Sequence, residues 1–176
     1  TGPMGFDENM GRLIGTPGMT DILGDYDFEI TADDDPIAAA QNMLEATITA
    51  FGATNFSDFF VLHLVTGMRA VTRVLPHLAS ADDQRRMIRA FWKACVFIYI
   101  ARGSPSTANA AEYLSPEGVR SWEEIVEVVL SFNESHLAKV VYLCRENFRA
   151  TKNPIFQVAA DKATAWIETG QEWQQY

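Results

Sequence analysis

Apolar positions recur three and four residues apart through most of this chain, and no two segments form a convincing strand pair. This periodicity predicts six helices. Five of them cover approximately residues 36–51, 57–75, 82–102, 121–133 and 134–150, and the sixth begins at residues 153–154. We therefore predict an all-α fold, an irregular multi-helix bundle of about six helices.

Local signals mark the starts of three of these helices. Residues 33–36 place acidic residues directly before a proline, and proline is favoured at the first helical position. Ser80 with Asp83 resembles a capping box, and Ser121 with Glu124 forms the usual Ser–Glu version of it. These patterns predict where the first, third and fourth helices begin.

The first 24 residues differ from the rest of the chain. They contain six of its 11 glycines and show neither helical nor strand periodicity. We therefore predict a glycine-rich loop over residues 1–24, followed by a helical domain over residues 25–176. The chain begins at Thr1 rather than at a methionine, so we expect this loop to follow a further segment upstream.

Two features concern how the second and third helices pack. The stretch FWKACVFIYIA, at residues 91–101, is apolar on nearly all sides and predicts the central helix of the domain. Gly67 lies within the second helix, where a glycine costs about 1 kcal/mol relative to alanine. We expect it to permit the close approach of another helix or of a ligand.

Composition narrows the classes of partner. The chain of 176 residues is 48% hydrophobic, which is enough for one domain with a core. Its net charge of −9 argues against a surface for nucleic acid or phosphate.

Cys95 and Cys144 lie in apolar runs, so we expect buried free thiols and a cytoplasmic location. No apolar run reaches the roughly 18 to 20 residues of a membrane span, so we expect none.

Three histidines are the candidates for metal chemistry. His77 follows a proline at a helix end, where the helix dipole favours a solvated histidine. His63 and His136 are predicted on the core faces of long helices, and imidazole is the commonest metal ligand in such places. No nucleophile elbow, phosphate loop, CxxC pair or HExxH motif competes with them, and Cys144 is expected to be a core thiol.

His136 and Lys139 form an HxxK pair in a largely apolar helix. Three residues are nearly one helical turn, so both side chains project from one face. Burial of Lys139 would favour a neutral amine, which can add carbon dioxide and become an anionic carbamate ligand for a metal held by histidine. The alternative is that Lys139 reaches the surface and His136 is a satisfied core histidine.

The two histidine stretches together resemble the C-terminal half of the questin oxidase-like family. FFVLHLVTGMRAVTRVLP contains His63, and SHLAKVVYLCRE contains His136. The histidines lie 73 residues apart, in the order and at a separation similar to those expected for that family. The aromatic third helix and the final helix with Trp166 are similar too, so the resemblance covers most of the chain from about Asp25 onward.

This resemblance implies a specific chemistry. It implies an oxidoreductase that inserts oxygen into, and opens, a ring of an anthraquinone-like aromatic polyketide, with NADPH as the reductant. It also implies a non-haem iron held by histidines and a carboxylated lysine. By this resemblance His63 matches the histidine of an HxVTG stretch, and His136 and Lys139 match the HxxK pair. Oxygen and imidazole ligands together suit iron.

One part of the family pattern has no counterpart in this chain. The pattern needs further histidines from an N-terminal half, and no histidine precedes His63. We therefore expect a companion chain or segment to supply the remaining ligands. The alternative is a non-catalytic helical ligand-binding or interaction module that has lost the metal. For that module we expect an apolar cavity lined by Phe59, Phe60, Tyr99 and Tyr142.

Overall fold

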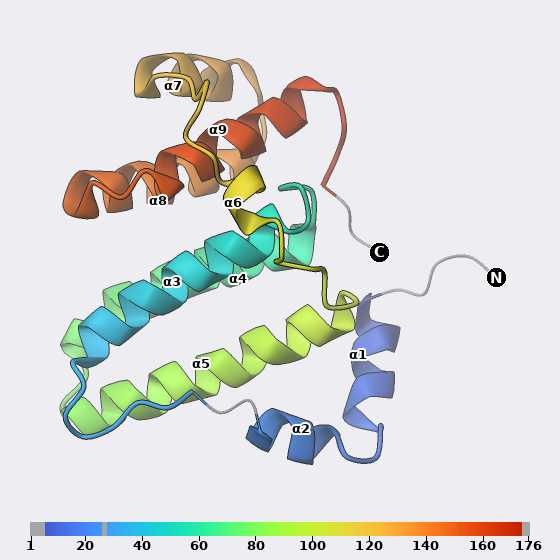
Figure 1. Ribbon diagram of the computed structural model, residues 1–176, viewed down its shortest axis with the longest axis vertical. Coiled ribbons are helices and arrows are strands. Elements are labelled where there is room, and N and C mark those ends of the chain that lie inside the picture. The colour runs from blue at the N-terminus through green and yellow to red at the C-terminus, as the bar shows by residue number, and fades with distance from the viewer. Residues whose placement is uncertain (1–5, 26–27, 174–176) are drawn as a thin grey trace.

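The computed structural model describes residues 6–25 and 28–173, and no strand occurs in these ranges (Figure 1). The prediction of an all-α fold is confirmed. Six of the described helices have ten residues or more. They are α3 (Pro36–Gly52), α4 (Phe59–Val74), α5 (Ala81–Ala101), α7 (Trp122–Ser131), α8 (Ser135–Thr151) and α9 (Ile155–Glu168). Each lies within about two residues of a predicted helix.

The predicted helix starts are confirmed by hydrogen bonds. The carboxylate of Asp35 accepts from the Ile37 N–H at the start of α3, where a proline occupies the first turn. The Ser80 hydroxyl accepts from the Asp83 N–H at the start of α5. At the start of α7 the Ser121–Glu124 capping box has both of its hydrogen bonds. Local sequence therefore determines where these helices begin.

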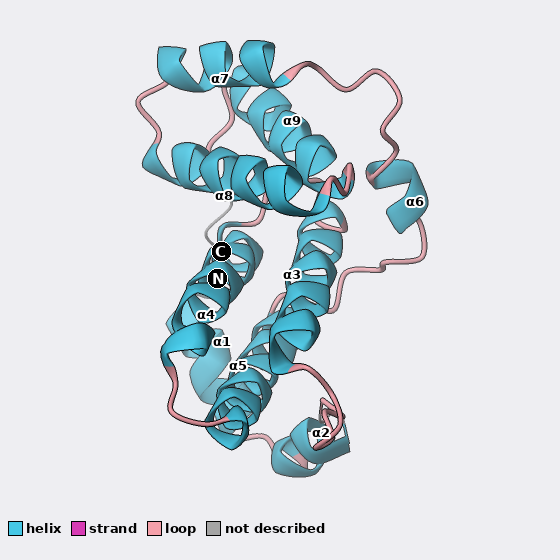
Figure 2. Ribbon diagram, turned by 90° about the vertical axis from the view of Figure 1, so that its left-hand side faces the viewer, coloured by secondary structure: helices cyan, strands magenta, loops and turns pink. Residues whose placement is uncertain are grey.

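The helices form two groups of three that share one interface (Figures 1 and 2). In the first group α3, α4 and α5 pack against one another, and in the second α7, α8 and α9 do so. The groups meet where α4 contacts α8 and α3 contacts α9. An ion pair of 3.6 Å between Arg73 of α4 and Glu146 of α8 crosses this boundary.

The end of the described chain returns to the first group. Trp173 follows α9 and is only 7% exposed. Its ring centroid lies 6.1 Å from that of Phe51, near the end of α3. Phe51 also contacts the ring of Phe56 at 5.3 Å. The segment after α9 therefore helps to close the core that the two groups share.

Residues 6–25 form two short helices, so the prediction of a loop without helical structure is wrong for these residues. They are α1 (Phe6–Ile14) and α2 (Met19–Asp25), and both lie against α5 (Figure 1). Helices of this length are marginal in isolation and depend on tertiary packing. Gly11 and Gly24 lie inside them and obscure the periodicity. Residues 1–5, also in the predicted loop, lie outside the described residues.

Helix α5 is not the buried central helix that its composition predicts. Only Ile88 and Cys95 of its 21 residues are buried. One side packs on α3 and α4, and the other is only partly covered by α1 and α2. Helix α4 has the central place instead, since it contacts α3, α5 and α8 and buries six residues. An all-round apolar helix indicates burial only if enough neighbours exist to cover it.

Gly67 of α4 permits the close approach of α5, as predicted. A Cβ atom at this position would lie 2.8 Å from Cζ of Phe91, a distance that real Cβ atoms do not tolerate. The missing side chain therefore makes room for the Phe91 ring. This close contact explains a glycine that helix propensity disfavours.

The stretch Phe59–His77 is long and apolar enough to cross a membrane by length and composition, which differs from the expectation that no such run exists. Core helices meet the same criterion. Here the stretch comprises α4 and a short 3₁₀ turn, Leu75–His77, and its buried side chains pack between α3, α5 and α8.

Candidate functional site

The structure brings His63 of α4 and His136 of α8 together. Their ring centroids are 5.4 Å apart, although 73 residues separate them in the sequence. The ring of Phe59 lies against both, at 4.4 Å from His63 and 4.9 Å from His136. The two histidines therefore form one site at the boundary between the two helix groups.

Asp58 fixes the start of α4 and so the position of this site. One carboxylate oxygen accepts from the N–H groups of Phe60 and Val61, at 2.9 and 3.0 Å. The other accepts from Nε of Arg102 at 2.6 Å, which ties α4 to the end of α5. Both side chains of this ion pair are nearly buried, at 6% and 11% exposed. Because α4 begins at Phe59, His63 lies one turn into the helix.

The hydrogen bonds of the two imidazoles leave the same nitrogen available on each. Nδ1 of His63 lies 2.7 Å from the carbonyl oxygen of Phe59. Nδ1 of His136 lies 2.9 Å from Oε1 of Glu134. A carbonyl and a carboxylate can only accept, so each Nδ1 carries the proton and donates it. In the neutral rings, each Nε2 then keeps a lone pair that can bind a metal.

Glu134 contacts the candidate site, and the sequence reasoning did not include it. It caps α8 by accepting from the Leu137 N–H, and it accepts from His136. Partial burial raises the pKa of Glu134, but these hydrogen bonds outweigh that effect and the pKa is lowered overall. An anionic carboxylate on the second nitrogen of a histidine is the usual support of a metal ligand. The signal in the sequence is an acidic residue two positions before His136.

His63, His136 and Lys139 were expected to be buried, and this expectation is wrong for His63 and Lys139. His63 is exposed, and His136 is half-buried with 26% of its side chain exposed. Lys139 is exposed, because the inward face of α8 carries Leu137, Val140 and Val141. The burial argument for a neutral Lys139 amine therefore does not hold. As expected, His77 is exposed at a helix end.

Two further expectations concern cavities and thiols. Cys95 and Cys144 are free and buried, as predicted, and burial raises the pKa of the Cys95 thiol to about 12.

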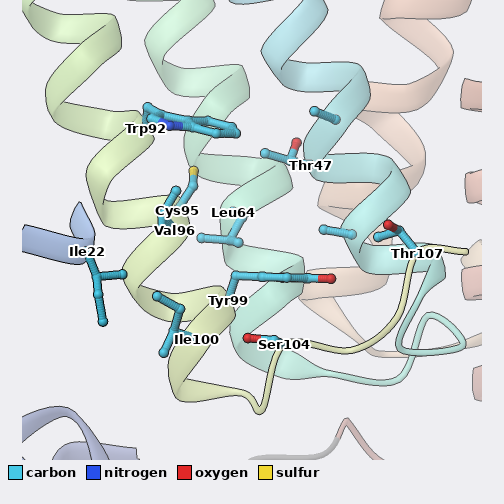
Figure 3. A pocket seen from close by; sticks show the side chains of 12 residues that line it. Ile22, Thr47, Leu64, Trp92, Cys95, Val96, Tyr99, Ile100, Ser104 and Thr107 are labelled. Carbon is cyan, nitrogen blue, oxygen red and sulfur yellow. The ribbon is translucent and has the colours of Figure 1, made fainter. Parts of the chain in front are cut away.

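An apolar cavity lies between α3, α4 and α5, and its lining differs from the prediction. Of the expected Phe59, Phe60, Tyr99 and Tyr142, only Tyr99 lines it (Figure 3). Tyr142 is instead 62% exposed.

As a candidate metal site, the histidine pair has few possible ligands among the described residues. Within residues 6–25 and 28–173, no group of three or more His, Cys, Asp and Glu side chains is arranged to hold a metal ion. If a metal were bound here, His63 and His136 would supply two nitrogen ligands, and a modified Lys139 would add oxygen. An iron site needs more ligands than this pair gives.

The fold and site define a class: an all-helical protein with a histidine pair shared by two neighbouring helices. The chain belongs to the questin oxidase-like family, since the sequence model of that family matches residues 10–144. The match includes both histidines and Lys139, and membership of this family indicates an oxidoreductase. No curated protein and no solved structure matches this chain.

Proposed function

We propose that this chain is the C-terminal helical part of an oxygenase that opens a ring of an anthraquinone-like aromatic polyketide. The reaction takes its oxygen from dioxygen and uses NADPH as the associated reductant. The support for this proposal is the family match together with the histidine pair, in which both Nδ1 atoms are engaged and both Nε2 atoms remain available.

The residues that would hold a non-haem iron are His63, His136 and a carboxylated Lys139. Two neutral imidazoles fit iron, and a carbamate oxygen would complement them. Iron bound here would supply the redox chemistry that the activation of dioxygen requires. The remaining ligands come, in this proposal, from a companion chain or segment, because the described residues offer no third histidine, cysteine or carboxylate for the site.

The protein's own groups have separate tasks in this site. The Phe59 carbonyl and the Glu134 carboxylate hold the two imidazoles in the tautomer that presents Nε2. The ring of Phe59 packs against both imidazoles and excludes water from that side of the pair. Lys139 lies one turn beyond His136 on α8 and would offer oxygen only as the carbamate.

The test is elemental analysis of the protein purified without chelators, together with any accompanying chain. We expect iron close to stoichiometric amounts in the wild type. His136→Ala should lose the iron and the oxygenase activity, because it removes one of the two nitrogen ligands. His77→Ala is the matched control, since His77 is exposed and distant in the fold from the pair. Iron retained by His136→Ala, or no iron in the wild type, would contradict the proposal.

The second candidate is a non-catalytic helical ligand-binding or interaction module that has lost the metal. The observation that favours it is the incomplete ligand set of the described residues, together with the exposure of Lys139. It predicts a protein without iron that still binds an apolar ligand. Measuring iron content and ligand binding on the same preparation separates the two candidates.

A further inference from the structure

Three arginines lie around one glutamate where α4 meets α8. Glu146 of α8 forms ion pairs with Arg73 of α4 at 3.6 Å and with Arg149 of α8 at 3.3 Å. Arg69 lies one turn before Arg73 on α4, close enough to Glu146 that the carboxylate raises the pKa of its guanidinium. In this arginine cluster, three positive charges therefore share a single negative charge.

Arg69 is the least satisfied member of the arginine cluster. It is half-buried, and its guanidinium forms neither an ion pair nor a hydrogen bond with any described residue. Burial lowers the pKa of Arg69, and repulsion by Arg73 lowers it further; Glu146 and Tyr142 oppose these effects without outweighing them. Arg69 therefore holds a partly desolvated charge that has no direct partner, and a bound anion would supply one.

The local charge of the arginine cluster is opposite in sign to that of the whole chain. The chain has a net charge of −9, whereas three arginines and one glutamate give an excess of +2. Charges in water are largely screened beyond about 8 Å at physiological ionic strength. An anion beside Glu146 therefore interacts mainly with the three guanidinium groups, and the overall charge does not exclude its binding.

The arginine cluster is separate from the histidine pair. Arg73 follows His63 by ten residues, and Glu146 follows His136 by ten, so α4 and α8 run alongside one another in the same direction. Ten residues span about 15 Å of an α-helix. A ligand at the arginine cluster would therefore lie about 15 Å along the boundary from the two imidazoles.

The charge and the donors of the arginine cluster suit a phosphate group. Guanidinium groups bind phosphate oxygens through paired N–H donors. A phosphate monoester carries a charge of about −2 near pH 7 and has three acceptor oxygens. This charge would balance the excess of +2, whereas a single carboxylate would leave one positive charge uncompensated.

The groups that would contact a phosphate are accessible. The side chains of Arg73 and Arg149 are 60% and 61% exposed, so they can reach an anion without disturbing the core. Tyr142 is 62% exposed beside Arg69, and its hydroxyl can donate to a further oxygen. A phosphate at the surface between α4 and α8 can therefore meet donors from both helices.

We propose that Arg69, Arg73 and Arg149 form a binding site for a dianionic phosphate group, either free or as a monoester of a small molecule. The proposal does not rest on the proposed function, because neither the histidines nor iron take part in it. Since the arginines come from both helix groups, the bound phosphate would also hold α4 and α8 together.

The test is isothermal titration calorimetry of the whole chain with phenyl phosphate at pH 7.5 and low ionic strength. We expect one saturable site for which inorganic phosphate competes. Phenol, which lacks the phosphate, and benzoate, which carries a single charge, should each bind at least tenfold more weakly. Tighter binding of phenyl phosphate than of inorganic phosphate identifies an ester as the preferred ligand, and equal binding identifies the free ion. No saturable binding of phenyl phosphate, or equal binding of phenol or benzoate, would overturn the proposal.

Two variants test the guanidinium groups. Arg69→Gln and Arg73→Gln each remove one charge and keep a polar side chain, and we expect at least tenfold weaker binding of phenyl phosphate by each. Arg12→Gln is the matched control, because Arg12 forms a similar ion pair with Glu8 at 3.3 Å on α1, away from α4 and α8. Unchanged affinity in the two cluster variants, or an equal loss in Arg12→Gln, would overturn the proposal.

Glu146→Gln separates a phosphate site from a purely structural group of ion pairs. Without the carboxylate, the excess charge rises to +3 and the guanidinium donors are released, so we expect at least threefold tighter binding of phenyl phosphate. Glu8→Gln removes the same charge from the ion pair on α1 and should leave the affinity unchanged. Unchanged or weaker binding by Glu146→Gln would show that the arginines serve Glu146 alone and would overturn the proposal.

Discussion

A histidine can bind a metal only through a nitrogen that keeps its lone pair, and hydrogen bonds decide which nitrogen that is. Here the Phe59 carbonyl and the Glu134 carboxylate both engage Nδ1. The pairing of His63 with His136 agrees with the sequence interpretation. The contact of Glu134 with His136 was missed, because the side chain that caps α8 also accepts from the imidazole and lies outside the HxxK motif.

The exposure of Lys139 could have been predicted from the helical wheel. Two residues along an α-helix correspond to about 200° of rotation, so Lys139 lies nearly opposite Leu137. Leu137, Val140 and Cys144 define the inward face of α8. The apolar composition of the stretch suggested burial for every residue, whereas the position of each residue decides it.

Glu134→Gln tests the carboxylate's support of His136. The amide oxygen of glutamine can still accept one hydrogen bond, but the negative charge is lost. We expect affinity for a divalent metal, measured by titration with Fe²⁺ or Co²⁺, to fall by about 10- to 100-fold, since that is the usual effect of removing such a support. Glu127→Gln on the exposed side of α7 is the control. Equal metal affinities in the two variants would show that the Glu134 charge does not support metal binding by His136.

The lowered pKa of Glu134 gives a dependence of stability on pH. A carboxyl group whose pKa is lower in the folded state stabilises that state above its unfolded pKa, which is close to 4.5. The contribution is lost as the pH falls through the lower, folded-state pKa. We expect wild type to be more stable than Glu134→Ala at pH 7, with a smaller difference at pH 3, as measured by urea unfolding. A difference independent of pH would contradict the role of the charge.

At the scale of elements, helices with their own start signals were predicted well. Asp35 and Ser121 begin α3 and α7 through contacts with residues two or three positions away. Helices α1 and α2 were missed, because they depend on packing against α5 rather than on local signals. The position of α5 at the edge of its group was missed for a similar reason, since a sequence does not show how many neighbours cover a helix.

Gly67→Ala tests the contact between α4 and α5. The added Cβ gains about 1 kcal/mol of helix propensity but collides with Phe91, and overpacking costs about 1 to 3 kcal/mol. We expect a net loss of about 1 kcal/mol in the free energy of urea unfolding. In a Phe91→Ala background the same substitution should become stabilising. The same effect in both backgrounds would show that Phe91 does not require the glycine.

At the scale of the whole molecule, the two groups of helices share a continuous core. Residues of α3, α4, α8 and α9 contribute to it, and Trp173 closes it against Phe51. The all-α class could be predicted because it depends on periodicity alone. The division into two groups could not, because it depends on which helix faces meet.

Trp173→Ala tests whether this core makes the molecule one cooperative unit. Truncation of a buried tryptophan lowers the free energy of unfolding by about 3 to 5 kcal/mol, and it should destabilise both groups of helices. We expect a lower midpoint of urea unfolding in a single transition, with circular dichroism and tryptophan fluorescence coinciding. Tyr142→Ala, at a 62% exposed position, should change stability by less than about 0.5 kcal/mol. Two separate transitions would mean that the groups fold independently.

The region recognised by the family model and the folding unit do not end at the same residue. The match ends at residue 144, in the middle of α8, whereas α9 lies beyond it and buries eight residues. A fragment trimmed to the match would lose the last seven residues of α8 and all of α9, and the faces of α3 and α8 that α9 covers would be open to water. Anyone producing shorter versions of this protein for crystallisation or assay should therefore set the boundary after Trp173, where the shared core closes.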